Sequence, residues 1–155
     1  MKLLVNKAVT FVEVIQERLN SDVPTNGIKQ PKSLKGKLLP YQLQGVDWMR
    51  RLYENGSHGM LADEMGLGKT VEVIGLLAFL REAGVWGPVL IMGPLSTLGN
   101  WMNEFAKWLP SVSVLRYHGD KEERKQLRAK LKAEGRKSLV GVWIFSDCRW
   151  IILSS

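Results

Sequence analysis

The sequence predicts an α/β fold with a mainly parallel sheet flanked by helices. From residue 38 onward, short apolar segments alternate with longer helical patterns, as in chains whose parallel strands are joined by helices. A glycine-containing loop also separates a predicted strand from a predicted helix. The 155 residues are 45% apolar and 24% charged, which suits one ordinary domain or part of a larger one and excludes wholesale disorder.

The first 37 residues form a predicted N-terminal helix and linker. Apolar side chains recur at helical spacing over residues 7–19, which indicates an amphipathic packing or coiled-coil helix. Residues 20–37 contain Pro and Gly and read as the linker. The opening apolar run stops at Asn6 and Lys7, so we expect no secretion signal, and no stretch is long enough to span a bilayer. With Cys148 as the only cysteine, we expect a soluble intracellular chain.

The next elements surround the glycine-containing loop. A helix is expected from Pro40 through Tyr53, ended by the Asn55-Gly56 pair. Residues 60–62 are expected to form a short buried strand. A helix then runs from Lys69 to about residue 83. Its expected apolar stripe consists of Val71, Ile74, Leu77, Ala78 and Phe79.

The rest of the chain continues the alternation. Predicted strands lie at 89–92, 112–115 and 139–145, and predicted helices lie at 98–108 and 120–134. Pro94 ends the first of these strands, and the last helix is highly charged. Right-handed crossovers between parallel strands are expected to place the helices against the sheet.

The loop at residues 63–70, DEMGLGKT, has the features of a phosphate-binding loop. Gly66 and Gly68 lack a Cβ and let the backbone curl closely around phosphate oxygens. The following helix directs its positive N-terminal dipole at the anion. Lys69 can reach the outer phosphates, and the Thr70 hydroxyl can join the coordination of Mg²⁺. The candidate loop residues are Asp63, Glu64, Met65, Gly66, Leu67, Gly68, Lys69 and Thr70.

Other interpretations of this loop remain open. Asp63 stands where the generic phosphate-loop pattern has its first glycine, so an ordinary glycine-rich turn is the alternative. A kinase or a small GTPase is weaker, because their nucleotide-selecting motifs are absent. A metal site is not expected, since His58 and His118 do not pair with Cys148 at ligand spacing.

Four ordered segments resemble the Snf2 family of helicase-like chromatin-remodelling ATPases. The loop at 63–70 resembles the family's motif I, in which an Asp at the start is usual. LPYQLQGVDWM at 39–49 resembles the segment before it, PLSTLGNW at 94–101 resembles motif Ia, and YHGDKEER at 117–124 resembles the segment that follows. The resemblance runs from about residue 30 to residue 132. Within the family, the sequence of these segments most resembles that of the lymphoid-specific helicase group, with the imitation-switch group second.

The resemblance implies an ATP-driven translocase on double-stranded DNA that remodels nucleosomes in the nucleus. Residues 38–146 would be an incomplete RecA-like first ATPase lobe that uses ATP and Mg²⁺, and residues 147–155 would be a tail outside the family pattern. By position in the family, Gln42 would read adenine through its amide, although a surface amide is the alternative. The implied DNA contacts are Ser96, Thr97, Asn100, Trp101 and Arg124, and Trp101 could equally be a core residue.

Basic residues dominate the segment 116–137. It carries nine Lys or Arg against four acidic residues, a net charge of +5, while the whole chain has a net charge of +7 and a pI of about 9.7. This pattern indicates either a salt-sensitive face for DNA phosphates or a solvated helix with pairs such as Asp120–Arg124.

The sequence departs from the family in the parts that hydrolyse ATP. Phosphoryl transfer needs an acidic group for Mg²⁺, a group that positions water and usually an arginine. The family's Asp-Glu pair lies on a later strand, whereas here Asp-Glu occurs once, at 63–64, and no second lobe follows. The expected protein is therefore a truncated ATP-binding part without a complete catalytic set. The alternatives are a non-catalytic nucleotide- or DNA-binding fragment and an unstable, non-functional one.

Overall fold

The computed structural model describes residues 28–85, 89–134 and 139–143, with side chains up to residue 130. These residues form two compact units. The first contains residues 28–30 and 38–76, and the second contains residues 31–37 and 77–143. The predicted helix at 7–19, residues 20–27 of the predicted linker and the tail at 147–155 lie outside the described residues. In the part of the chain that is described, every helix is too short or too polar to cross a bilayer.

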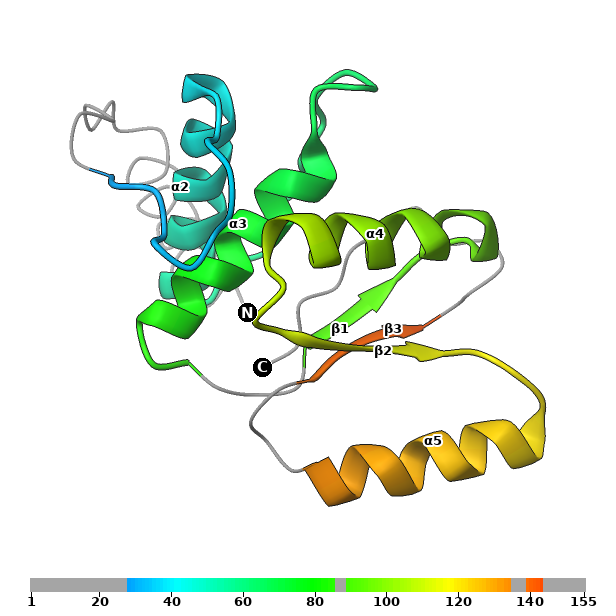
Figure 1. The fold of residues 1–155 in the computed structure, drawn as a ribbon. Helices are drawn as coiled ribbons and strands as arrows, with labels where there is room; N and C mark the ends of the chain where they lie inside the picture. The colour runs from blue at the N-terminus through cyan, green and yellow to red at the C-terminus, as the bar shows by residue number, and fades with distance from the viewer. Residues whose placement is uncertain (1–27, 86–88, 135–138, 144–155) are drawn as a thin grey trace, which may run out of the picture. The chain divides into compact units, whose positions relative to one another are not determined.

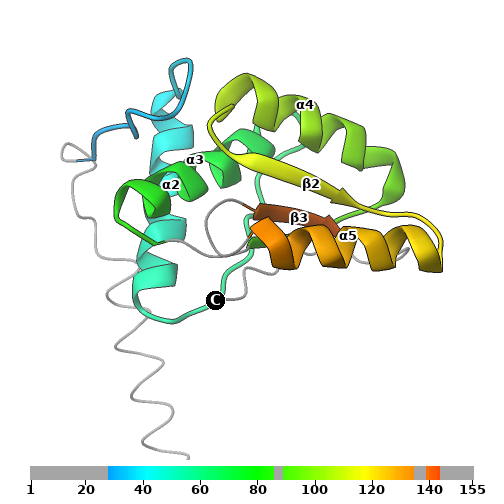
Figure 2. The ribbon, with the colours of Figure 1, turned by 60° about the horizontal axis from the view of Figure 1, so that its bottom comes forward.

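The first unit is built on helix α2 and the first part of helix α3, residues 69–76, while the end of α3 belongs to the second unit. Helix α2 spans Pro40–Glu54 and helix α3 spans Lys69–Glu82, as the sequence predicted, and they lie side by side in Figures 1 and 2. Pro40 opens α2 at a position where its missing N–H costs nothing. The helix ends at Asn55, and Gly56 follows with φ +62°.

Two glycines let these helices approach closely. A Cβ on Gly75 of α3 would come within 2.9 Å of Val46 Cγ2, and a Cβ on Gly45 of α2 would come within 2.6 Å of Glu72 Oε2. Such contacts are shorter than van der Waals packing allows, so a side chain at either position would force Val46 or Glu72 to move. The buried apolar residues of this unit are Leu38, Val46, Met49, Leu52, Val71, Val73, Ile74 and Leu76.

The expected apolar stripe on α3 is wrong in extent. Residues 71–78 are all buried, so the helix is enclosed on every side rather than along one face. Val73 and Leu76, which the stripe left out, are as buried as Ile74, whereas Phe79 is half-buried. A helix surrounded in this way shows no amphipathic period for sequence reasoning to detect.

The expected strand at residues 60–62 does not form. These residues have no regular secondary structure, and Met60 is 60% exposed. The segment before the loop instead lies against α2. Gly59 is so close to Trp48 and Leu52 that a Cβ there would collide with both side chains. A strand exists only where a neighbour completes its hydrogen bonds. Among the described residues no strand pairs with this segment, although its apolar residues are typical of a strand.

The second unit is a three-stranded parallel sheet with helices on both sides. Its strands are β1 (Val89–Met92), β2 (Ser113–Tyr117) and β3 (Leu139–Trp143), in the spatial order β1-β3-β2. Both pairings are parallel; Val89 pairs with Val140, and Ser113 pairs with Leu139. The parallel sheet is confirmed, and β2 lies slightly later than its predicted 112–115.

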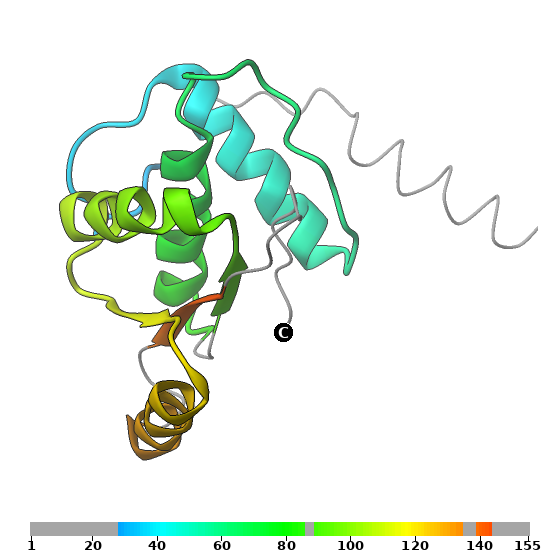
Figure 3. The same ribbon diagram turned by 90° about the vertical axis from the view of Figure 1, so that its right-hand side faces the viewer.

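The helices of this unit cover opposite sides of the sheet. Helix α4 (Leu98–Trp108) joins β1 to β2, and helix α5 (Lys121–Glu134) joins β2 back to β3. Because the two connections run across the sheet in opposite directions, crossovers of one hand place their helices on opposite faces. Figures 1 and 3 show α4 on one side and α5 on the other.

Residues 31–37, which belong to the predicted linker, are part of the second unit. The backbone N–H and hydroxyl of Ser33 donate to Glu82 Oε1 at 2.7 and 2.8 Å. These bonds, the backbone one foremost, hold the pKa of Glu82 below its usual value. The Lys35 N–H donates to the Trp108 carbonyl at 2.7 Å, and Gly36 lies against the Trp108 ring. The segment is therefore fixed to the ends of α3 and α4.

Candidate functional site

The loop at residues 63–68 turns through two glycines in the left-handed region. Gly66 has φ +95° and Gly68 has φ +93°, and no described residue other than glycine has a positive φ. Side chains with a Cβ resist this conformation, so both positions favour glycine for a backbone reason. A Cβ on Gly66 would meet nothing within 4 Å, which leaves its conformation as the only constraint there.

Lys69, the first residue of α3, folds its side chain back onto this loop. Its Nζ donates to the carbonyl of Asp63 at 2.6 Å and to that of Glu64 at 2.7 Å. An ammonium group has three donors and no acceptor, so these two bonds leave one donor for another partner. The loop therefore holds a positive charge at the N-terminus of a helix, which is the electrostatic setting that an anion prefers.

The first turn of α2 contacts the same loop through two side chains. Gln42 Nε2 and Tyr41 Oη both donate to the Leu67 carbonyl, each at 3.1 Å. Gln42 Oε1 accepts from the Leu39 N–H at 3.0 Å, which caps the start of α2. A Cβ on Gly68 would come within 2.5 Å of Gln42 Nε2, so the loop and α2 touch here.

Gln42 is buried, which rules out the surface-amide alternative that the sequence left open. Beyond these two hydrogen bonds, one N–H and one lone pair of the Gln42 amide remain. Tyr41 was not among the site residues predicted from the sequence. A tyrosine next to Gln42 was the only signal for it, because the bond to residue 67 spans 26 positions.

Glu72 is a second residue near the loop that was not among the site residues predicted from the sequence. Its carboxylate is 0% exposed, and neither oxygen has a hydrogen-bond partner within the described part of the chain. Burial raises the pKa of Glu72 to about 7, the nearby Asp63 adds to the rise, and Lys69 opposes it. An acidic residue three positions into the helix looks like an ordinary solvent-facing side chain, so nothing in the local sequence indicated burial.

The other loop candidates are accessible. Asp63, Glu64 and Met65 are exposed, with Met65 99% exposed, and Thr70 is half-buried at the start of α3. His58 and His118 are exposed, and within the described residues no three His, Cys, Asp or Glu side chains gather as a metal site would require. Cys148 lies outside those residues.

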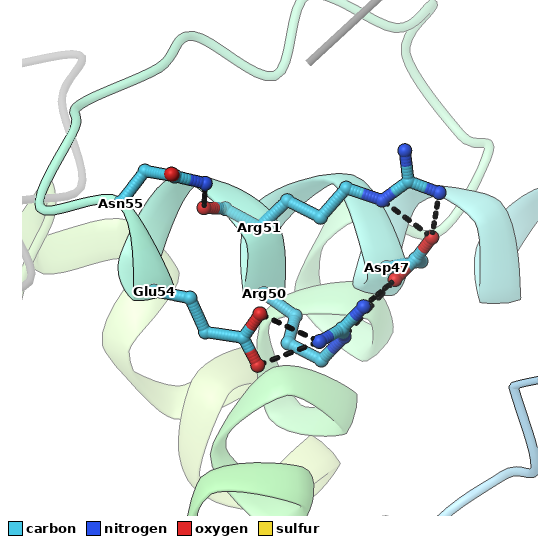
Figure 4. A network of polar contacts seen from close by, with 5 residues as sticks. All are labelled: Asp47, Arg50, Arg51, Glu54 and Asn55. Atoms are coloured by element: carbon cyan, nitrogen blue, oxygen red, sulfur yellow. Dashed lines mark hydrogen bonds and ion pairs between the residues drawn. The ribbon is translucent and has the colours of Figure 1, made fainter. Parts of the chain in front are cut away.

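An ion-pair network holds the middle of α2 (Figure 4). Asp47 is buried and accepts from Arg50 at 2.8 Å and from Arg51 at 2.7 Å, one arginine on each oxygen. Arg50 also contacts Glu54 at 2.6 Å. Because a buried carboxylate needs such partners, the network lets α2 carry Asp47 on a buried position. It stiffens the helix whose first turn reaches the loop.

The motif Ia candidates lie in the second unit, on the 3-10 turn η2 (Leu95–Thr97) and the first turn of α4. Ser96 and Asn100 are exposed, and Thr97 Oγ1 donates to the Pro94 carbonyl at 2.8 Å. Trp101 is only 8% exposed and packs against Phe105, with ring centroids 6.2 Å apart. Burial therefore supports the core role that the sequence left open for Trp101.

Helix α5 displays its charges to solvent. Lys121, Arg124, Lys125, Arg128 and Lys130 are exposed. The Asp120–Arg124 ion pair, which illustrated one of the two alternatives for this segment, is replaced by backbone contacts: the Asp120 carboxylate accepts from the Glu123 N–H at 2.8 Å, and Arg124 Nε donates to the Asp120 carbonyl at 3.2 Å. The Asp120 N–H also donates to Glu123 Oε2, which completes a reciprocal cap. The acidic side chains at this end serve the backbone and leave the arginine head available.

Comparison with known proteins gives a consistent result. The model of the SNF2-related domain family matches residues 41–143. The ISWI chromatin-remodeling complex ATPase CHR17 of Arabidopsis thaliana is 45% identical over 80% of this chain and 12% of its own length. The ATP-dependent DNA helicase DDM1 of the same plant is 53% identical over 61% of this chain and 12% of its own length.

A solved structure has a similar fold. The Sulfolobus solfataricus SWI2/SNF2 ATPase core in complex with double-stranded DNA matches with a TM-score of 0.62 and 33% identity, over 74% of this chain and 23% of that one. The likeness confirms the predicted α/β, RecA-like architecture. The chain spans about an eighth of the length of the ISWI and DDM1 relatives. With a family model matched over more than half of it, the chain belongs to the SNF2-related domain family of Snf2-type chromatin-remodelling ATPases.

Proposed function

We propose that this chain binds ATP through the loop at 63–70, as the nucleotide-binding part of an Snf2-type ATPase. The observation that carries the proposal is the placement of Lys69, whose Nζ lies on the carbonyls of Asp63 and Glu64 beside two glycines with positive φ. The loop N–H groups and this ammonium would hold the phosphates. Gln42 would contact the adenine with the donor and acceptor that its two internal bonds leave.

The loop also suits Mg²⁺ as the partner of the nucleotide. The Thr70 hydroxyl follows Lys69 at the start of α3 and would join the ion's coordination. Asp63 is exposed at the start of the same loop and adds negative charge to the region. When bound, Mg²⁺ neutralises part of the phosphate charge, while the chain's own groups orient the phosphates.

Isothermal calorimetry with Mg·ATP tests the proposal. Lys69→Ala removes the ammonium, and we expect binding to weaken at least tenfold, because hydrogen bonds to charged groups are worth about 1.5–3 kcal/mol. Lys37→Ala is the matched control, since it removes the same charge from an exposed lysine outside the loop. Equal affinity of the Lys69 variant and the native chain would refute ATP binding at this loop.

We propose slow or absent turnover for the 155-residue chain by itself. Asp-Glu occurs only at 63–64, within the loop, so these residues include no separate acidic pair for Mg²⁺ and water. Binding without hydrolysis is therefore the second candidate function. Phosphate release from Mg·ATP, measured with and without double-stranded DNA, distinguishes the two. Strong DNA-stimulated release would contradict this proposal.

The second unit is proposed to contact the backbone of double-stranded DNA. Ser96, Thr97 and Asn100 would supply polar contacts, Arg124 would bind a phosphate, and Trp101 would hold the motif from its buried side. The exposed lysines and arginines of α5 support an electrostatic contact. A related ATPase core is described in complex with double-stranded DNA. Nucleosomes as the substrate and the nucleus as the location are part of this proposal, which is supported by relatives named as chromatin-remodelling ATPases.

Binding of a labelled DNA duplex at several salt concentrations tests this contact. Arg124→Ala should weaken binding and reduce the salt dependence of the binding constant by about one charge. Lys37→Ala changes the net charge equally, and we expect it to change the affinity less. If both variants weaken binding by the same factor, the chain attracts DNA only through its net charge.

A further inference from the structure

One backbone carbonyl of the phosphate loop receives two side chains of α2. The Leu67 oxygen accepts from Gln42 Nε2 and from Tyr41 Oη, each at 3.1 Å. The two donors are adjacent residues in the first turn of the helix, so they approach the oxygen from one element. Double acceptance satisfies both lone pairs of this carbonyl within the protein.

The rigid peptide unit carries this constraint to the next amide. In a planar trans peptide, the C=O and the following N–H point in opposite directions. Two bonds that hold the Leu67 oxygen toward α2 therefore direct the Gly68 N–H toward the other side of the loop. Gly68 itself is fixed by φ +93° and by its contact with Gln42.

We propose that Tyr41 is a positioning residue for the phosphate loop: its hydroxyl holds the Leu67 carbonyl toward α2 and so keeps the Gly68 N–H directed at the phosphate chain. This inference rests on the proposed binding of ATP by residues 63–70. It assigns Tyr41 to the phosphate end of the nucleotide and gives it no part in reading the base. Removal of the hydroxyl leaves the peptide free to rotate, and ligand binding must then restore its orientation at a cost.

Tyr41 separates this role from core packing more cleanly than Gln42 does. Gln42 is buried and also caps the Leu39 N–H, so its substitution changes the helix start as well. Tyr41 is 41% exposed, and Tyr41→Phe removes the hydroxyl while the ring is retained. Tyr53→Phe is the matched control, because it removes a hydroxyl from the other end of α2.

The experiment measures calorimetric binding of tripolyphosphate, Mg·ATP and Mg·GTP to the full chain. We expect Tyr41→Phe to weaken all three by the same factor, roughly three- to tenfold, which is the range for loss of one neutral hydrogen bond. Tyr53→Phe should bind all three as the native chain does. Amide hydrogen exchange of Gly68, followed by ¹⁵N NMR in the free protein, should be faster in Tyr41→Phe. Melting temperatures of both variants verify that they are folded.

Four outcomes would overturn the inference. Unchanged affinity and unchanged Gly68 exchange in a folded Tyr41→Phe variant would show that the hydroxyl does not position the loop. Weaker binding of ATP with unchanged tripolyphosphate binding would assign Tyr41 to the base. If the native chain binds none of the ligands, or binds them as well after Lys69→Ala, the proposed function fails and this inference falls with it. Loss of binding in Lys69→Ala together with native binding in Tyr41→Phe refutes the positioning role alone.

Discussion

Helices α3 and α5 have the same length of 14 residues and both begin with lysine, yet different forces stabilise them. In α3, residues 71–78 are all buried, and the helix contains an acidic side chain without a hydrogen-bond partner among the described residues. In α5, the described side chains are exposed except for the half-buried Leu127, and the first turn has a reciprocal cap. Tertiary packing therefore dominates in α3, and local bonds dominate in α5.

The largest expected effect lies in the core of α3. Ile74 is fully buried, and Ile74→Ala should lower the free energy of unfolding by about 3–4 kcal/mol through lost burial and a cavity. Denaturant unfolding followed by circular dichroism measures this change. Leu127→Ala on α5 is the control, and we expect it to cost less than about 1 kcal/mol. Equal losses would contradict the contrast between the two helices.

The next effect concerns the buried acid of α3. The folded-state pKa of Glu72, about 7, lies above the ordinary value of 4.5, so folding binds a proton between these two pH values. The unfolding free energy therefore falls as the pH rises from about 4.5 to 7, and it stays low above that. Glu72→Gln should stabilise the protein by about 3 kcal/mol at pH 8 and change little at pH 4.

Denaturant titrations of Glu72→Gln at both pH values measure this difference. Glu122→Gln on the exposed surface of α5 is the matched control, for which we expect little change at either pH. A gain from Glu72→Gln that is equal at pH 4 and pH 8 would show that the Glu72 carboxylate is not the source of the destabilisation.

A smaller effect is expected at the cap of α5. Asp120→Ala removes the acceptor of the Glu123 N–H, and loss of such a cap costs about 1 kcal/mol. Asp120→Asn keeps a capping oxygen and should recover most of this stability. Helicity from circular dichroism and hydrogen exchange of the first α5 amides report the loss. If Ala and Asn behave alike, the charge of Asp120 matters more than its cap.

The smallest effect is expected from the exposed pair Glu122–Lys125, which is 3.6 Å apart. Lys125→Ala should change the unfolding free energy by less than about 0.5 kcal/mol, since exposed pairs contribute little and salt screens them. Thermal melts at low and high salt measure this change. A loss above 1 kcal/mol would mean that the side chains of α5 contribute to tertiary packing.

The helices and the residue types of the phosphate loop could be predicted from local sequence. Pro40, the Asn55-Gly56 pair and Gly84, which has φ +83°, act on their own turns, so the bounds of α2 and α3 could be predicted closely. The glycines and the lysine of the loop were predicted for the same reason, because their conformation and charge are local properties.

Contacts between residues far apart in the chain became visible only in the folded protein. Residues 60–62 are apolar, as in a strand, but no strand pairs with them among the described residues. Glu72 is of a residue type that usually faces solvent, yet its side chain is buried. The bond from Tyr41 to Leu67 spans 26 positions. Burial and strand pairing depend on the neighbours that folding brings together. The residue pattern of one segment is therefore not enough to predict them.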